Sequence, residues 1–160
     1  MADVVGNTSK ILAPLIALVA TTKVQGTIEG ALRKKMVAAG FINSLVGERV
    51  YPLRTPDNVQ FPCIVYTRIT SDRQHTLEAA GNLTYSRFVI DSYALQNSKN
   101  GGYAESVAIA RAVQQTLDGF RGPADGVDIQ GILQMGETHI YEDEIEVYRI
   151  SQNWMVIHRE

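Results

Sequence analysis

The densest group of candidate metal ligands lies near the C-terminal end and consists of Glu142, Asp143, Glu144 and Glu146. A calcium loop places oxygen ligands at alternating positions around a central glycine, and this stretch has neither feature. Its later glutamates alternate with Ile145 and Val147, which is typical of a half-exposed strand. The stretch is therefore predicted to be a solvated hairpin corner, not a metal site.

The histidines and the single cysteine do not form a recognisable site either. His75, His139 and His158 each lack a second histidine or cysteine at ligand spacing, which argues against zinc. Cys63 lies at a predicted strand start with no neighbour that would lower its pKa, so a small buried residue is predicted. No serine or histidine lies in a nucleophile-elbow context. We therefore expect no catalytic residue, cofactor or metal, and an enzyme is the least favoured hypothesis.

Glycines at positions 119, 122, 126 and 131 lie between a predicted helix and a predicted strand. Loops that cradle phosphates run in the other direction, from a strand into a helix, so this pattern does not predict a nucleotide site.

Three basic residues, Arg68, Arg73 and Arg87, cluster around a predicted hairpin, close to Tyr66 and Tyr85. A nucleic-acid groove uses such side chains. A solvated strand face explains them more simply as far as direct binding is concerned. In a ring of identical copies, however, the same three arginines would be candidates for lining a channel.

Length and charge set the limits within which these residues must be positioned. The chain has 160 residues with 15 Lys and Arg against 17 Asp and Glu, a net charge of -2. One domain with a proper core is the default expectation, and bulk positive charge for holding nucleic acid is lacking. A single cysteine excludes an internal disulfide framework and fits a reducing compartment.

The N-terminal part contains a ten-residue apolar run at 11–20, too short to cross a bilayer. It follows Lys10 as in a secretory signal, but one positive charge and no clean cleavage site argue against that interpretation. We expect residues 1–25 to be an extension that packs on the domain or on a neighbouring copy, and residues 26–160 to form a single domain.

Two helices and four strands are predicted to build this domain. One helix starts at the N-cap Thr27 and ends at Gly40, and the other follows an apolar stripe from Tyr103 to Leu117. The strands are expected at residues 63–72, 83–95, 127–141 and 144–158, with the first hairpin turning at Gly81 and Asn82. Residues 41–46 are expected as a further apolar turn, residues 49–52 as a short extended piece, and residues 53–60 and 122–126 as loops.

This order, α-β-β-α-β-β, predicts an α+β fold with two helices on one face of a mainly antiparallel four-stranded sheet. The second strand places Phe88 and Ile90 on one face and Tyr85, Val89 and Tyr93 on the other. Because helices on one side normally leave a polar face on the other, the sequence predicts a second surface that needs cover.

Five short stretches, in order and at matching spacing, resemble the family of phage tail completion or tail terminator proteins. They are residues 41–52 (FINSLVGERVYP), 61–69 (FPCIVYTRI), 87–94 (RFVIDSYA), the helix end at 117–120 (LDGF), and the last hairpin with 148–151 (YRIS) and 154–158 (WMVIH). The resemblance covers roughly residues 27–158, so the first 25 residues are additional to the pattern.

The resemblance implies a structural virion protein without an active site, assembled in the host cytoplasm and located at the head-proximal end of the tail. Members of this family form a ring, commonly of six copies, that stacks on the last ring of the tail tube protein and stops its growth. The ring also offers a surface to the head-tail connector or stopper protein, and DNA passes through its lumen without sequence-specific binding.

For such a ring, we expect contacts between copies from the hairpin tip at 72–82, the loop at 53–60 and the N-terminal segment. The individual interface candidates are Arg73, His75, Leu77, Glu78, Leu83, Tyr85, Asp57 and Asn58, and the candidates for the lumen are Arg68, Arg73 and Arg87. A stand-alone α+β ligand-binding or oligomeric interaction module remains the alternative, and the sequence does not separate a terminator from an adjacent neck protein.

Overall fold

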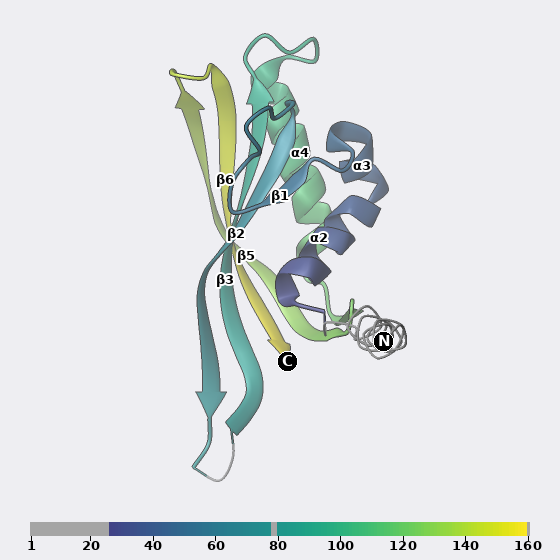
Figure 1. The fold of residues 1–160 in the computed structure, drawn as a ribbon, viewed down its shortest axis with the longest axis vertical. Coiled ribbons are helices and arrows are strands. Elements are labelled where there is room, and N and C mark those ends of the chain that lie inside the picture. The colour runs from purple at the N-terminus through teal and green to yellow at the C-terminus, as the bar shows by residue number, and fades with distance from the viewer. Residues whose placement is uncertain (1–25, 78–79, 160) are drawn as a thin grey trace, which may run out of the picture.

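The computed structural model describes residues 26–77 and 80–159 (Figure 1). The predicted N-terminal extension and Glu78 lie outside the described residues. Within them the elements, in chain order, are α2 (Ile28–Ala38), α3 (Gly40–Val46), β1 (Val50–Pro52), β2 (Cys63–His75), β3 (Ala80–Leu95), α4 (Gly102–Leu117), β4 (Gly122–Ala124), β5 (Val127–Glu142) and β6 (Val147–Arg159).

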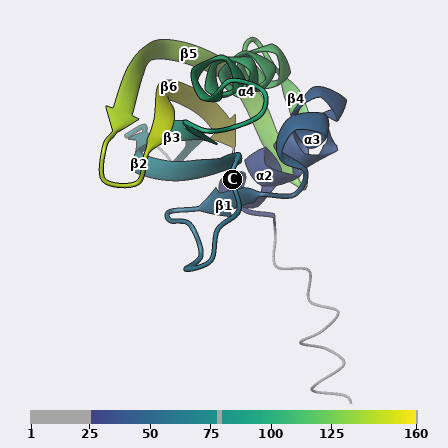
Figure 2. The same cartoon turned by 90° about the horizontal axis from the view of Figure 1, so that it is seen from above.

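The strands form one curled sheet in the order β1-β2-β3-β6-β5-β4. Strand β1 pairs with β2 in parallel, and the other neighbours pair antiparallel. Viewed from above, the sheet bends around the helices as a half-barrel, with all three described helices on its concave side (Figure 2). One side of the sheet therefore packs on helices, while the other is turned outwards.

Helix α2 begins at the expected place because Thr27 caps it. The hydroxyl of Thr27 accepts a hydrogen bond from the backbone N–H of Gly30 at 3.2 Å, which satisfies one of the unpaired donors of the first turn. The helix ends at Ala38, and Gly40 begins the separate helix α3 instead of closing α2. Residues 41–46, expected as a turn, are therefore part of a helix.

Helix α4 packs across the middle of the sheet. Its residues Ile109, Val113 and Leu117 are fully buried and belong to one core cluster with Phe88 of β3 and Trp154 of β6. The predicted stripe is confirmed from its middle to its C-terminal end only. Its first member, Tyr103, is 49% exposed because the packed face of the first turn is formed by other residues.

The expected fold class is wrong. The described residues form six strands and three helices in the order α-α-β-β-β-α-β-β-β, not four strands and two helices in the order α-β-β-α-β-β, and the sheet is mixed. The missed strands, β1 and β4, have three residues each, and each contains a proline. Such short segments show no alternation of polar and apolar residues, so only pairing with a long neighbour makes them strands.

Both predicted hairpins are present, the first longer than expected and the second with a longer corner, because β6 begins at Val147 and not at residue 144. Strand β2 runs on to His75 and β3 begins at Ala80, so Gly81 and Asn82 are part of a strand and not the turn. The sequence in this region is polar, which suggested a loop, yet continuous pairing with the opposite strand keeps it extended. As a result, the hairpin reaches well past the helical layer (Figure 1). None of the described helices combines the length and apolar character needed to cross a membrane.

Candidate interaction surfaces

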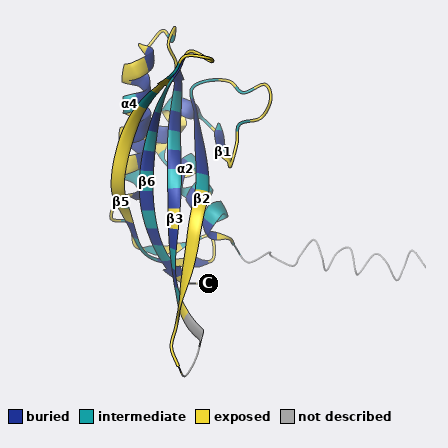
Figure 3. Cartoon of the chain, turned by 90° about the vertical axis from the view of Figure 1, so that its left-hand side faces the viewer, coloured by how far each residue is buried: buried dark blue, intermediate teal, exposed yellow. Residues whose placement is uncertain are grey.

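The sheet face turned away from the helices, here called the outer face, has no described helix in front of it (Figure 3). On the central strands, Tyr85 lies opposite Ile157, and Arg87 lies opposite Met155. These four residues and Val89 are half-buried or exposed, whereas their neighbours Phe88, Trp154 and Val156 are fully buried against the helices. The alternation predicted for this part of β3 is thus present, and both faces contain apolar groups.

Two bulges add further apolar residues to the outer face. The pairing of β2 shifts between Arg68 and Thr70, and that of β5 shifts between Gln134 and Gly136. The extra residues are Ile69 and Met135, which are 57% and 59% exposed. Since a bulge leaves one residue without an opposite partner, it re-aims that side chain. Both residues line a shallow hollow of about 260 Å³ together with Arg87, Val89 and Asn153.

Among the described residues outside the sheet, Phe61 covers the start of β2 on this face. Phe61, in the loop before β2, lies with its ring centre 6.3 Å from that of Tyr93. Cys63, opposite Tyr93 in the sheet, is fully buried. Burial raises the pKa of the Cys63 thiol to about 12, although the positive charge of Arg49 acts in the opposite direction. The position is consistent with the predicted small buried residue.

Stability is expected to fall at alkaline pH because of this thiol. The unfolded chain loses the Cys63 proton near pH 8.5 and the folded chain only near pH 12, so the unfolded state is favoured as pH rises between these values. The free energy of unfolding should fall by at most about 1.4 kcal/mol per pH unit in this range. Urea unfolding at pH 7, 9 and 10 should show this decrease, with a smaller decrease in Cys63→Ala. Equal slopes in the two proteins would contradict the assignment.

The second prominent feature is the projecting end of the first hairpin, residues 72–83, here called the hairpin arm (Figure 1). Of the predicted interface residues, Arg73, His75 and Leu77 lie on the arm and are exposed, and Leu77 is exposed completely. Leu83 and Tyr85, at the base of the arm, are half-buried. The arm is therefore a protrusion with an apolar side chain close to its tip.

A buried polar group holds the base of the arm, and sequence analysis did not find it. The Ser86 hydroxyl lies 2.9 Å from Nε2 of His158 and donates to the hydroxyl of Ser71 at 3.3 Å. Ser86 and His158 are fully buried. Their separation of 72 residues in the sequence explains why no local signal indicated the pair.

The other predicted interface residues are not close to the arm. Asp57 and Asn58 are exposed in the loop that connects β1 to β2, which projects at the β1 edge of the sheet, away from the hairpin arm (Figure 3). The interface candidates therefore form two separate protrusions.

The predicted basic group is also divided. Arg68 lies on the helix side of the sheet, where its Nε is 2.9 Å from Oε1 of Glu29 in α2. Arg87 lies on the outer face, and Arg73 lies on the arm opposite Thr84. Because Arg68 is committed to an ion pair within the chain, the three arginines do not form one cationic surface in a single copy.

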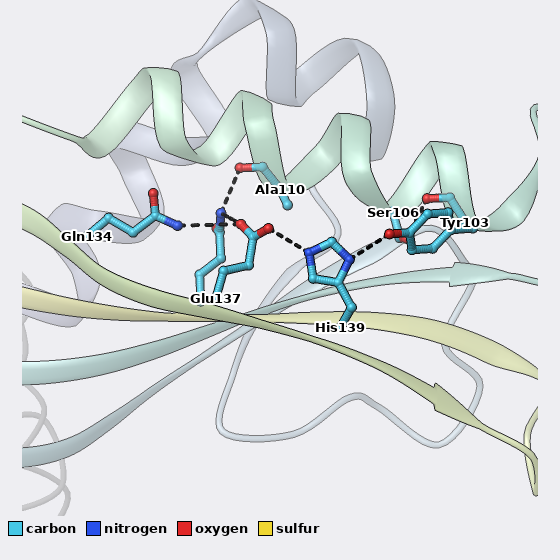
Figure 4. A network of polar contacts seen from close by, with 7 residues as sticks. Tyr103, Ser106, Ala110, Gln134, Glu137 and His139 are labelled. Atoms are coloured by element: carbon cyan, nitrogen blue, oxygen red, sulfur yellow. Dashed lines mark hydrogen bonds and ion pairs between the residues drawn. The ribbon is translucent and has the colours of Figure 1, made fainter.

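The most extensive polar network connects α4 to β5 and β6 (Figure 4). The Tyr103 hydroxyl is 2.8 Å from Nδ1 of His139, and Nε2 of the same ring is 2.7 Å from Oε1 of Glu137. The buried Gln152 amide donates to Oε2 of Glu137 at 2.9 Å and to the carbonyl of Ala110 at 3.1 Å. Although partial burial acts to raise the pKa of Glu137, hydrogen bonds from Gln152 and His139 hold it below its ordinary value.

This network ties the helix to the sheet, because His139 of β5 contacts the phenol of Tyr103 on α4 through one ring nitrogen and the carboxylate of Glu137 through the other. Among residues 26–77 and 80–159, no three His, Cys, Asp or Glu side chains are grouped so that they would hold a metal ion.

Replacing Glu137 is expected to remove part of the acid sensitivity of the fold. Because its pKa is lower in the folded chain, Glu137 stabilises the fold above the pKa of the unfolded chain. That contribution is lost as pH falls through the folded value, and solvent screening limits it to about 1 kcal/mol or less. Glu137→Gln should therefore flatten the decrease in stability below about pH 5 in urea titrations. Glu144→Gln, at the exposed β5–β6 corner, serves as the control, and an equal change in both variants would contradict the role of Glu137.

Comparisons with known proteins add independent information. The model of the family described as tail completion protein gp17 matches residues 30–159. Among solved structures, a chain from "Virion of native gene transfer agent (GTA) particle" has a similar fold, with a TM-score of 0.65 and 18% sequence identity. The match covers 88% of this chain and 100% of that chain. No curated protein matches the sequence.

Proposed function

The chain belongs to the family of tail completion protein gp17 and is thus a structural protein of the phage virion tail; from this premise we propose that copies of it form a ring that ends the tail tube and joins it to the head. The resemblance found in the sequence analysis is confirmed at the level of the family. The ring, its copy number and the termination of the tube are the parts that we propose.

The observation that carries the proposal is the apolar outer face, which no described helix of the same chain covers. Half-buried Val89, Met155 and Ile157, and Leu133 at 48% exposure, form a surface of the kind that marks protein contacts. A ring requires two different patches that meet head to tail and close by rotation. One chain carries several exposed regions of different composition, of which the outer face and the hairpin arm are the most prominent.

The fold comparison is compatible with this role. The similar chain is part of a gene transfer agent particle, as its title states, and its fold extends over most of this chain. We propose that the partners of the ring are the tail tube protein and the head-tail connector or stopper protein. Residues 1–25 are proposed to be an extension that contributes to contacts between copies, next to a single domain at 26–160.

DNA is proposed to pass through the lumen of the ring without sequence-specific binding. The net charge of -2 supports passage instead of tight binding, because strong non-specific binding requires an excess of basic side chains. Arg87 and Arg73 remain candidates for the lumen, whereas the ion pair of Arg68 with Glu29 makes it the weakest of the three.

Two measurements test the proposed function. Light scattering combined with electron microscopy should find rings, free or bound to tail tubes, and a strict monomer under all conditions would contradict the proposal. Electron microscopy of tails assembled without this protein then distinguishes termination of the tail tube from joining of the tail to the head. Tubes of unregulated length would support termination, whereas tails of normal length that fail to bind heads would support joining alone.

A further inference from the structure

Near each end of the sheet lies a long strand, β2 or β5, one edge of which pairs with a described strand over only a short length. Strand β1 pairs only with Ile64, Val65 and Tyr66 of β2, so residues 67–75 of β2 have β3 as their one described strand partner. On the other side, β4 pairs with β5 only up to Ile129. Contacts with the end of α4 continue to Gln134, whose backbone N–H donates to Asp118. We call residues 67–75 the β2 edge and residues 135–142 the β5 edge.

Such edges are unusual in a protein that remains a monomer. Exposed strand edges are templates for pairing with another chain, and monomeric proteins normally block them with short strands or cover them. The short strands β1 and β4 protect less than half of the length of β2 and of β5. The parts of β2 and β5 that β1 and β4 leave free have similar lengths, so the β2 edge and the β5 edge can pair with each other along their full length.

Exposed apolar side chains are concentrated along these same strands. Ile69 and Leu77 lie on β2 and the arm that continues it, and Leu133, Met135 and Tyr141 lie on β5. These residues are five of the ten large apolar side chains that are exposed in the described part of the chain. The central strands β3 and β6 contribute only Leu95, at the end of β3.

The strand directions fit a head-to-tail arrangement. Strands β2, β3, β6 and β5 are adjacent in this order, and each runs antiparallel to the next. Strands β2 and β5 therefore run in opposite directions. The two edges lie at different levels, because Thr67 is level with Gly136 across the sheet and the β2 edge continues away from the β5 edge. A second copy in the same orientation, placed beside the first and shifted along the strands, brings its β2 edge antiparallel to the β5 edge, as in an antiparallel two-stranded ladder. If the strands are inclined to the ring axis, rotation about that axis repeats this step and closes a heterologous interface into a ring.

We infer that the β2 edge of one copy pairs with the β5 edge of the next, so that the sheets of neighbouring copies form one continuous antiparallel sheet. This inference rests on the proposed ring and adds which two surfaces meet in it. The pairing satisfies the backbone groups of both edges.

Cysteine cross-linking tests the inference directly. Asp72 on the β2 edge and Thr138 on the β5 edge are exposed, and the native Cys63 is fully buried. The double variant Asp72→Cys/Thr138→Cys is treated under assembly conditions with a short flexible bis-maleimide, which tolerates small differences in register. The single variants are controls, and Asp72→Cys/Lys99→Cys, with the second cysteine in the exposed loop after β3, is the matched control pair.

The expected result is a ladder of covalent dimers, trimers and higher species that ends at the copy number of the ring, for the Asp72→Cys/Thr138→Cys variant only. Rings of normal mass without a ladder would overturn the pairing of edges and leave the proposed function intact. Covalent dimers of Asp72→Cys alone would also overturn the inference, because they indicate two β2 edges related by a two-fold axis. A monomer without any cross-link would overturn both the inference and the proposed ring.

Discussion

Replacing residues 75–82 by the dipeptide Asn-Gly is expected to abolish ring assembly while the domain still folds. The change removes the end of the hairpin arm, including the exposed His75 and Leu77, and closes the hairpin with a favoured two-residue turn. Because the described side chains among those removed are exposed, the free energy of unfolding should change by about 0.5 kcal/mol or less. Light scattering should show that the mass falls from that of a ring to that of a monomer.

A matched control separates loss of assembly from damage to the fold. Arg111→Ala alters an exposed side chain of α4, in the helical layer on the opposite side from the outer face. This variant should assemble as the native protein does. If the shortened hairpin also forms rings of normal mass, the arm makes no essential contact between copies.

The largest effect on folding is expected for Trp154→Ala. Trp154 lies on the central strand β6, is 1% exposed, and packs in the core cluster with Phe88 and Leu117. Truncation of such a residue leaves a cavity that the neighbouring strands cannot fill, at a cost of about 3–5 kcal/mol. Urea unfolding monitored by circular dichroism should show this loss as a large decrease in the midpoint, a substantial part of the total stability of a domain of this size.

The neighbouring Met155 provides the control for this variant. It follows Trp154 on the same strand but points to the outer face and is half-buried. Met155→Ala should cost about 1 kcal/mol or less, because most of the side chain is not in the core. Comparable losses in the two variants would show that the outer face is as well packed as the core, which contradicts its assignment as an uncovered surface.

The sequence alone was sufficient for the long elements and for the family. Thr27 as an N-cap, the spacing of Ala110, Val113 and Leu117, and the alternation around Phe88 are local patterns, and each of them is present in the structure. Five short stretches in the right order identified the tail completion family, which the comparison with the family model confirms. These features are predictable because they depend on neighbours within a few residues along the chain.

The number of strands and helices was not predictable in the same way. Strands β1 and β4 exist only because β2 and β5 offer them a hydrogen-bonding partner, and their three residues carry no pattern of their own. The extension of the first hairpin to His75 also depends on pairing across the strand, since its polar sequence favours a loop.

Composition and local pattern thus determined that the chain has a helix-covered sheet with apolar residues on both faces and no recognisable catalytic motif. The tertiary structure alone decided where those residues are exposed. It placed Ile69 and Met135 at bulges beside one hollow, separated Arg68 from Arg87 on opposite faces, and joined Tyr103, His139 and Glu137 in one network. The physical reason is that register, bulges and free edges arise from pairing between segments far apart in the chain, and local sequence does not encode which strand lies opposite which.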